Sequence, residues 1–169
     1  LGANDGIVSV AALVVGVAGA TRDEKVILTA GIAGLIAGAL SMAAGEYVSV
    51  SSQRDSEKAM LAREQFELEN FPEEELKELA HIYEQKGLSA KTAQIVAKEL
   101  TANDAYAAHV DAELGIDPDD LTNPWHAAIA SALSFFAGAI IPLLAIVLFP
   151  ESIRVVMTFF AVIIALGIT

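Results

Sequence analysis

The sequence predicts an all-α fold: a polytopic transmembrane protein with a small helical domain inserted after its second span. Val26–Gly45 contains no Asp, Glu, Lys or Arg over 20 residues, and Leu121–Pro150 contains none over 30. A bilayer core about 30 Å thick needs roughly 20 apolar residues of helix, so each run is long enough to cross it. The segment between them, Ser51–Trp125, holds 17 of the 22 acidic residues and 7 of the 10 basic ones. We therefore expect a charged, water-exposed domain between membrane helices.

Four apolar segments are expected to be membrane helices. The first, Gly6–Ala20, is short, and the chain begins without an initiator Met, so we expect this helix to be clipped. The polar turn Thr21–Lys25 joins it to the second span as a hairpin. The third span, Pro124–Phe149, begins beside Trp125, and tryptophan is enriched at membrane interfaces. The fourth, Ser152–Thr169, contains one charge and runs to the C-terminus without a polar tail, so we expect the chain to end early.

The second span carries small residues at intervals of four. Ala30, Gly34 and Gly38 form one row, and Ala33, Ala37 and Ser41 form another. This pattern predicts close helix packing in lipid and needs no chemistry to explain it.

The acidic segment is expected to continue the second span as a helix. No Gly or Pro occurs from Glu46 to Asn70, which predicts one long helix that runs out of the membrane. It ends at Phe71, because a residue before proline disfavours the helical conformation. Pro72 then starts the next helix, with three glutamates in the first turn, where negative charge complements the helix dipole.

Two more helices follow before the chain returns to the membrane. Gly87 closes the preceding helix, and Ser89 caps the next one. Asn103 or Asp104 starts a last helix, which ends at Gly115. Residues 116–123 form a turn-rich linker. The predicted divisions of the chain are 1–50 for the first two spans, 51–123 for the helical domain and 124–169 for the last two spans.

Composition excludes several classes of function. Cysteine is absent, so disulfides and thiolate metal sites are excluded. The formal net charge of −12 argues against nucleic acid and anionic lipid headgroups as partners of the helical domain. No nucleophile–base arrangement, phosphate loop or dinucleotide motif stands out. We expect neither an enzyme nor a bound prosthetic group.

Three residues are candidates for an ion path through the spans. Asp5 lies at the start of an apolar helix, and carboxylates within membranes usually face a cavity or a partner. The alternative is an exposed helix cap at the surface. Met42 is either core packing or, if it faces Asp5, a second ligand, and a carboxylate with a thioether suits a borderline transition metal. Glu46 lies one turn from Met42 on the same face, and it either extends this path or stands in headgroup water.

The helical domain contains a second candidate set, made mainly of glutamates. Two Glu-x-x-Glu pairs occur in its first two helices, and each pair shares one helix face. Carboxylates on one face raise one another's pKa unless a cation joins them. If the turn at Pro72 folds the helices together, four carboxylates converge, and a His and a Glu on the last helix add to them. The alternative is a solvated acidic face. The candidate metal ligands are Glu64, Glu67, Glu75, Glu78, His109 and Glu113.

Together these segments resemble the vacuolar iron transporter family. The resemblance rests on LGANDGIVS at the N-terminus, LTAGIAGLIAGALSMAAGEYVSVSSQRD across the second span, AREQFELENFPEEELKE in the helical domain, and ELGI before the return to the membrane. These motifs occur in order over essentially the whole chain.

The resemblance implies a homodimer of five-helix subunits, with a path between the two copies of the first span. It implies a cytoplasmic metal-binding domain after the second span. It also implies export of Fe²⁺, with Mn²⁺ or other divalent ions such as Zn²⁺ or Co²⁺ accepted, in exchange for protons. Asp5 and Met42 match path residues of the family, and the five glutamates named above match its soluble metal ligands.

Three departures from the family pattern matter, and the first two bear on selectivity. Plant-type members carry a glutamate where Gly34 aligns, and Glu46 is its nearest substitute. They also carry a Met pair where this chain has His109 and Val110, so the soluble site is expected to be harder. The third departure is the fifth span, which we expect to be absent from this chain.

Two functions fit the sequence. The first is a proton-coupled exporter that gathers cytosolic Fe²⁺ on the glutamates and passes it through Met42 and Asp5. The second is a membrane-anchored metal-binding or sensing module without transport, which is favoured if Asp5 is exposed at the surface. A ferroxidase-like di-iron centre is disfavoured, because such sites use Glu-x-x-His on each of two helices.

The expected location follows from the spans and the basic residues. Lys and Arg are slightly more frequent beyond the second span than in the opposite loop, which favours a cytoplasmic helical domain. The membrane is the plasma membrane for a bacterial protein and the vacuolar membrane for a eukaryotic one.

Overall fold

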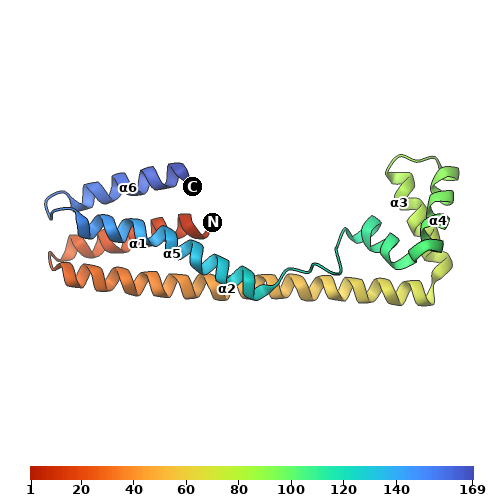
Figure 1. Ribbon diagram of the computed structural model, residues 1–169, viewed down its shortest axis with the longest axis horizontal. Coiled ribbons are helices and arrows are strands. Elements are labelled where there is room, and N and C mark those ends of the chain that lie inside the picture. Colours follow the sequence, from red (N-terminus) through yellow and green to blue (C-terminus); the bar gives the residue numbers. More distant parts are fainter. The chain divides into compact units, whose positions relative to one another are not determined.

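A computed structural model describes residues 1–169 and contains helices but no strand, so the all-α prediction is confirmed (Figure 1). The chain forms two compact units. Unit 1 comprises Leu1–Val50 and Asn123–Thr169, and unit 2 comprises Ser51–Thr122. In chain order the elements are α1 (Gly2–Ala20), α2 (Glu24–Asn70), α3 (Pro72–Gln85), α4 (Ala90–His109), the π-helical turn η1 (Val110–Leu114), α5 (Pro124–Leu148) and α6 (Arg154–Ile168).

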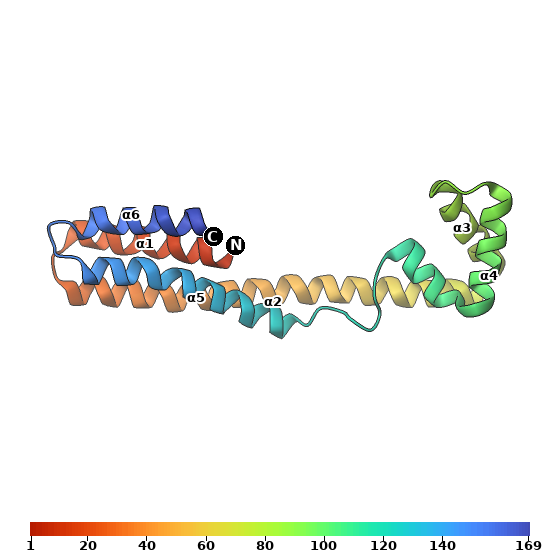
Figure 2. The same ribbon diagram turned by 45° about the horizontal axis from the view of Figure 1, so that its top comes forward.

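Unit 1 is a bundle of α1, the first half of α2, α5 and α6, which lie side by side in both views (Figures 1 and 2). By length and hydropathy, α1, α2 and α5 are each able to cross a membrane, whereas α6 is a shorter apolar helix. Large apolar side chains cover the outside of the bundle, and Ile36, Leu40 and Leu133 are each more than half exposed. Such a surface suits lipid rather than water.

The core of unit 1 lies between α1, α2 and α5. Phe135 occupies its centre and is 1% exposed. Val10 and Val14 face it from α1, and Ile27 and Leu35 face it from α2. The burial of these aliphatic and aromatic side chains fixes how the three helices pack around the cavity described below.

Two glycines bring the α1 and α5 backbones into direct contact. A Cβ on Gly6 would collide with the carbonyl oxygen of Phe135, and a Cβ on Gly138 would collide with that of Ala3. The glycines of α2 act differently, because the space above Gly34 and Gly38 is filled by side chains of the other helices. The closest backbone approach is therefore between the first and third spans, and not along the small-residue rows of the second.

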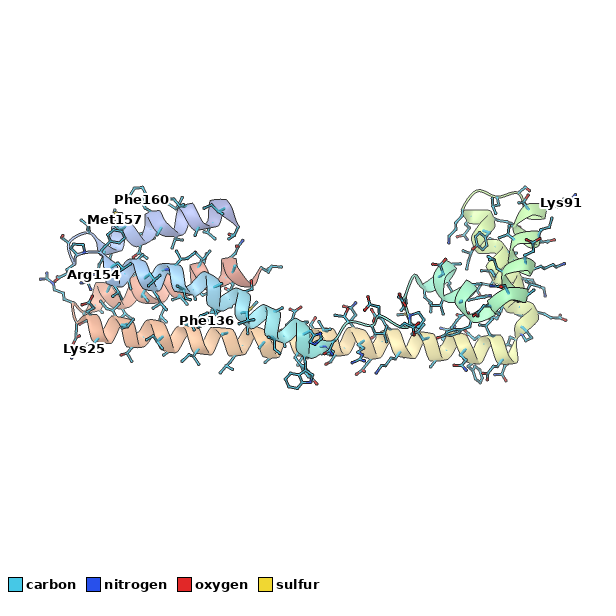
Figure 3. The ribbon with its side chains drawn as sticks, in the orientation of Figure 1. Lys25, Lys91, Phe136, Arg154, Met157 and Phe160 are labelled. Carbon is cyan, nitrogen blue, oxygen red and sulfur yellow. The ribbon has the colours of Figure 1, made fainter.

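Polar and aromatic residues mark the two ends of unit 1. At one end Arg22 Nε lies 3.1 Å from Glu151 Oε1, which joins the α1–α2 turn to the α5–α6 turn. Figure 3 shows Lys25 near this end. At the other end the rings of Tyr47 and Trp125 are 4.8 Å apart between centroids. The helix from Lys25 to Tyr47 is about 33 Å long at 1.5 Å per residue, which matches a bilayer core.

The first helix boundaries of unit 2 are the predicted ones. α2 continues unbroken to Asn70, and α3 starts at Pro72. Gly87 has φ +103°, a conformation that disfavours other residues. Ser89 Oγ accepts a hydrogen bond from the Thr92 N–H at 3.3 Å and so caps α4.

The last helix of unit 2 also begins where it was predicted to begin. Asp104 interrupts α4 with φ −159° and ψ 99°, and its Oδ1 accepts a hydrogen bond from the Ala107 N–H at 2.9 Å. Asp104 is therefore the N-cap of a new helical segment. This segment ends in the turn η1, where the Gly115 N–H donates to the Val110 carbonyl at 2.8 Å, five residues back. The π-helical turn was not predicted.

Candidate metal sites

Unit 2 brings three of the predicted ligands into one buried cluster. Glu64 of α2, Glu75 of α3 and His109 of α4 each offer a ligand atom, and these atoms all lie within 4.8 Å of one another. His109 Nδ1 lies 2.9 Å from Glu64 Oε1 and 3.6 Å from Glu75 Oε2. Glu64 is 3% exposed, Glu75 6% and His109 0%. We call these residues the buried cluster.

Three features of the local fold assemble this cluster. The break at Phe71 allows α3 to fold back, so that Glu75 in its first turn faces the end of α2. The break at Asp104 redirects the chain before His109. The small core of Leu79, Ala80 and Ala97 packs α3 against α4. One ligand of the buried cluster thus comes from each of three helices.

Several polar atoms in the cluster have no hydrogen-bond partner. Glu64 Oε1 and both ring nitrogens of His109 are buried and make no well-oriented hydrogen bond, although Glu64 Oε1 and His109 Nδ1 lie 2.9 Å apart. Unpaired buried polar atoms are uncommon and costly, and here the carboxylate and imidazole atoms face one another. A cation between them would satisfy both. Oxygen and imidazole nitrogen donors together suit Fe²⁺, Mn²⁺, Co²⁺ or Zn²⁺.

The surroundings of the cluster disfavour the charged forms of its side chains. Burial raises the pKa of Glu64 to about 7, and the neighbouring carboxylates of Glu113 and Glu75 add to the shift. Burial also raises the pKa values of Glu75 and Glu113, with a further contribution from Glu78. Burial lowers the pKa of His109. Perturbed groups gathered in this way are typical of functional sites.

The other predicted ligands lie at the margin of the cluster. Glu113 Oε2 is 3.9 Å from His109 Nδ1, and its side chain is 33% exposed. Glu67 pairs instead with Arg63, whose Nη2 lies 2.9 Å from Glu67 Oε1. Glu78 is exposed. The structure therefore brings Glu64, Glu75 and His109 together, places Glu113 beside them, and leaves Glu67 and Glu78 outside.

A single Glu-x-x-His motif occurs in the domain, from Glu78 to His81. Both residues are exposed, and His81 Nε2 contacts Gln85 Nε2 at 2.8 Å. A di-iron bundle needs this motif on each of two helices with both pointing inward. The structure therefore gives no support to a di-iron centre.

Unit 1 contains a second candidate site, a cavity of about 320 Å³ between α1, α2 and α5. Asp5 of α1 and Met42 of α2 both line it, so the cavity offers a carboxylate and a thioether. Met42 lies five residues inside Tyr47, which is about 7.5 Å along the helix. Its full lining is Asp5, Ser9, Val10, Leu13, Gly34, Gly38, Ser41, Met42 and Phe135.

Two hydroxyl groups in this cavity were not predicted. Ser9 Oγ donates a hydrogen bond to Asp5 Oδ1 at 2.7 Å, and Ser41 lies next to Met42 in the sequence. The spacing of four residues between Asp5 and Ser9 was the available signal, because such residues share a helix face. Glu46 is exposed and does not line the cavity.

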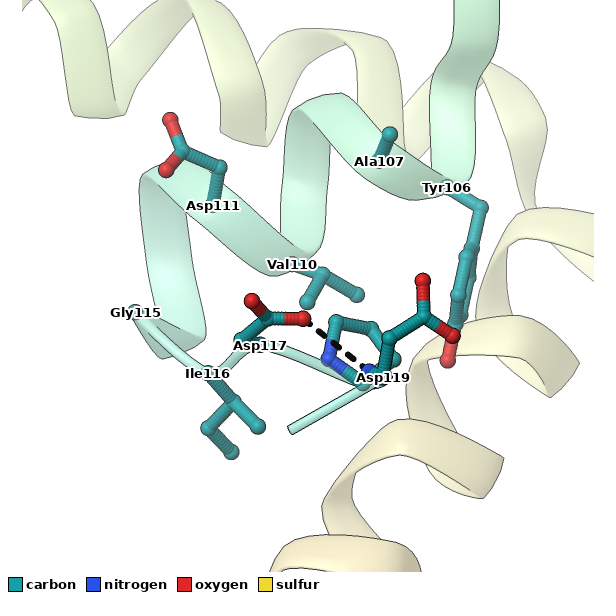
Figure 4. A pocket seen from close by; sticks show the side chains of 9 residues that line it. Tyr106, Ala107, Val110, Asp111, Gly115, Ile116, Asp117 and Asp119 are labelled. Carbon is teal, nitrogen blue, oxygen red and sulfur yellow. Dashed lines mark hydrogen bonds between the residues drawn. The ribbon is translucent and has the colours of Figure 1, made fainter. Parts of the chain in front are cut away.

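A third cavity, of about 530 Å³, lies beside η1 and is a solvated acidic surface. Figure 4 shows the carboxylates of Asp111, Asp117 and Asp119 around it. The Asp119 N–H donates to Asp117 Oδ1 at 3.0 Å, which is ordinary turn chemistry. All three aspartates are exposed, so this surface lacks the burial that distinguishes the cluster.

The fold and the two sites define a class: a polytopic helical membrane protein with a polar cavity among its spans and an acidic helical domain. Comparison with known sequences is consistent with that class. The sequence pattern of the VIT family matches residues 1–169. The chain belongs to the VIT family.

Individual relatives extend over most of the chain. A "Vacuolar iron transporter" of Acanthamoeba castellanii is 48% identical over 85% of the chain and 52% of its own length. "Vacuolar iron transporter homolog 2.1" of Arabidopsis thaliana is 40% identical over 96% of the chain and 58% of its own length. "Vacuolar iron transporter 1" of the same plant is 34% identical over 95% and 67%. The chain thus spans about half the length of the first two of these relatives.

Proposed function

We propose that this chain is the metal-collecting and membrane-crossing part of an exporter that moves Fe²⁺, and also Mn²⁺, out of the cytosol in exchange for protons. The observation that carries the proposal is the cavity in unit 1, which Asp5 and Met42 line from two different apolar helices. A carboxylate held there needs a partner, and a divalent cation provides one. The names of the relatives support iron as the metal.

In this proposal unit 2 lies in the cytosol and gathers the metal. The buried cluster supplies two carboxylates and one imidazole, a donor set that suits Fe²⁺, Mn²⁺, Co²⁺ and Zn²⁺ better than Mg²⁺ or Ca²⁺, which prefer oxygen ligands alone. Glu113 lies close enough to join on a small movement of its partly exposed side chain. Glu67 and Glu78 add negative charge that attracts cations to the surface.

The cavity then carries the metal through the membrane. Asp5 supplies a hard anionic oxygen and Met42 a soft sulfur, and this mixture favours a borderline transition ion. The Ser9 hydroxyl orients Asp5 through its hydrogen bond. A carboxylate binds either a proton or a metal ion, so competition at Asp5 couples the two flows.

The path is proposed to lie between two copies of the chain. Asp5 and Ser9 are exposed on the single chain although both line the cavity. An exposed carboxylate within an apolar bundle is costly in lipid, and a second copy facing α1 would cover it. A bacterial protein of this kind belongs in the plasma membrane and a eukaryotic one in the vacuolar membrane.

The rival function is a membrane-anchored metal sensor that uses the buried cluster and carries nothing across. Two observations support it: the cluster is complete within unit 2, and Asp5 is exposed on the single chain. The rival assigns no role to Asp5 or Met42, whereas the transport proposal requires both. The two functions therefore differ in whether metal crosses the membrane.

A flux experiment separates them. The protein is placed in liposomes that contain an Fe²⁺-sensitive dye, and Fe²⁺ is added with and without a pH gradient. An exporter predicts that the dye is quenched, and that quenching is faster when the pH gradient drives protons in the direction opposite to the metal. Metal binding without quenching of the dye supports the sensor. Quenching at the same rate with and without the pH gradient would contradict the proton coupling.

A further inference from the structure

The cavity in unit 1 is polar at one end and apolar at the other. Along α1 its lining runs from Asp5 to Leu13, and along α2 from Met42 back to Gly34. Each stretch covers nine residues, or about 12 Å of helix from the first residue to the last. Asp5 and Met42 lie at the end near the Tyr47–Trp125 pair, whereas Leu13 and Gly34 lie toward the short turns.

Leu13 is seated directly on the backbone of α2. A Cβ on Gly34 would collide with Leu13 Cδ2, so the leucine occupies the space where any other residue at position 34 would place its side chain. No residue beyond Leu13 on α1, or before Gly34 on α2, lines the cavity. This contact therefore forms the inner limit of the cavity.

Beyond Leu13 no side chain is available to bind an ion. Residues 14–20 of α1 are Val, Ala and Gly only. On the facing stretch 26–33 of α2 the one hydroxyl, that of Thr29, donates to the carbonyl of Lys25 at 2.7 Å. Narrow apolar segments of this kind exclude water and hold back ions until they widen.

We propose that Leu13, seated on Gly34, is the hydrophobic barrier that closes the Asp5–Met42 cavity from the side of the membrane where the short turns lie. Once a second copy of the chain covers the exposed Asp5 and Ser9 on its lateral face, the cavity is open only toward the side on which unit 2 is attached. The barrier is released when Leu13 moves off Gly34. The inference rests on the proposed function, because a barrier matters only if metal enters the cavity.

The absence of cysteine makes the barrier testable by thiol labelling. Ser9, Leu13 and Gly16 follow one face of α1, and a Cβ on Gly16 meets nothing within 4 Å. Ser9→Cys and Gly16→Cys therefore place single thiols on either side of Leu13. We expect a membrane-impermeant thiol reagent to modify Ser9→Cys only from the side of unit 2, and Gly16→Cys only from the opposite side.

Removing the leucine should abolish this separation. Ser9→Cys combined with Leu13→Ala is expected to react from the turn side as well, whereas Ser9→Cys alone does not, with Leu13→Val as a milder second variant. Ser9→Cys combined with Leu144→Ala is the matched control, because Leu144 is 53% exposed on α5 and does not line the cavity. Modification of Ser9→Cys from the turn side with Leu13 intact, or none from the side of unit 2, would overturn the barrier. Labelling does not need transport, so an Fe²⁺ flux assay on the unaltered protein tests the proposed function separately.

Discussion

At the scale of single residues, the buried cluster explains why this acidic domain contains an imidazole. Two carboxylates at low dielectric repel each other, and burial lowers the pKa of His109, which favours its neutral form. Neutral imidazole is the form that ligates metals. His109 is therefore suited to share a cation with Glu64 and Glu75, and not to form a simple ion pair with them.

Glu64→Gln is predicted to weaken binding of Mn²⁺ or Co²⁺ to the protein by tenfold or more. A hydrogen bond to a charged group is worth about 1.5–3 kcal/mol, and a carboxylate bound to a divalent cation is held at least as strongly. About 1.4 kcal/mol corresponds to tenfold in affinity. Isothermal titration measures the change. Glu69→Gln is the control, since Glu69 is exposed on the same helix. Equal affinities for the two variants would show that Glu64 is not a metal ligand.

Ser9→Ala is predicted to raise the KM for Fe²⁺ transport severalfold, because Asp5 loses the hydrogen bond that orients its carboxylate. Ser9→Thr keeps the hydroxyl and should restore most of the affinity. Ser41→Ala lines the same cavity without this contact and serves as the comparison. Identical kinetics for Ser9→Ala and Ser41→Ala would show that Ser9 does not position Asp5.

The sequence pointed to most of the residues in both sites, but not to their pairings. Asp5 stood out as a carboxylate in an apolar segment, and Glu64 and Glu75 stood out through their spacing. Glu67 pairs with Arg63, whereas Glu64 is buried. This difference depends on which side of α2 packs against α3 and α4. Spacing along one helix does not determine this, because it gives the relative angle of two residues and not the face that is covered.

At the scale of elements, the capping rules located the helix ends of unit 2. Pro72, Gly87, Ser89 and Asp104 all act where local chemistry predicted, because each effect depends on a few neighbouring residues. The π-helical turn η1 was missed. Its five-residue hydrogen bond to Gly115 leaves no composition signal, and such turns are frequent at functional sites.

Asp104→Ala is predicted to destabilise unit 2 by about 1 kcal/mol, the usual cost of losing an N-cap. Because Asp104 starts the segment that carries His109, metal affinity should fall as well. Asp104→Asn keeps a capping oxygen and should behave like the original protein. Thermal unfolding with and without Mn²⁺ measures both effects, and unchanged stability in Asp104→Ala would contradict the capping role.

The metal-free protein is predicted to lose stability as the pH rises from 4.5 to about 7. The folded pKa of Glu64 is about 7 against an ordinary value of 4.5, so the folded state holds more protons in this window and its advantage disappears as they leave. The raised pKa values of Glu75 and Glu113 act in the same direction, while the lowered pKa of His109 opposes them in part. Glu64→Gln should flatten the curve.

Divalent metal should reverse this pH dependence. Above about pH 7 the carboxylates are free to bind a cation, and a ligand that binds only the folded state stabilises it. Mn²⁺ should therefore raise the melting temperature most at high pH and least near pH 4.5. A metal-independent pH profile would contradict the assignment of the cluster.

The packing of unit 1 shows where element-scale patterns fail. Small residues at intervals of four in the second span predicted close helix contact, yet the backbones meet at Gly6 and Gly138 of α1 and α5. In α2 the same small residues form notches that receive Leu13 and Phe135. A small residue permits close approach, but the partner's own side chains decide whether backbone or side chain fills the space.

At the scale of the whole molecule, the two candidate metal sites lie in separate units of the chain. Unit 2 buries its ligands among α2, α3 and α4, and unit 1 holds its cavity among α1, α2 and α5. The continuous helix α2 contributes to both, with Met42 on one part and Glu64 on the other. The long uncharged runs of the sequence fall mainly in unit 1, and most of the charged residues fall in unit 2.

The most direct test of the transport path compares Fe²⁺ flux and metal binding in Asp5→Asn. The variant keeps the size of the side chain and the apolar core, so the fold is expected to remain intact. Fe²⁺ entry into liposomes should be lost, whereas Mn²⁺ binding to the buried cluster should be unchanged. Fe²⁺ entry at the original rate in Asp5→Asn would contradict the path through the cavity.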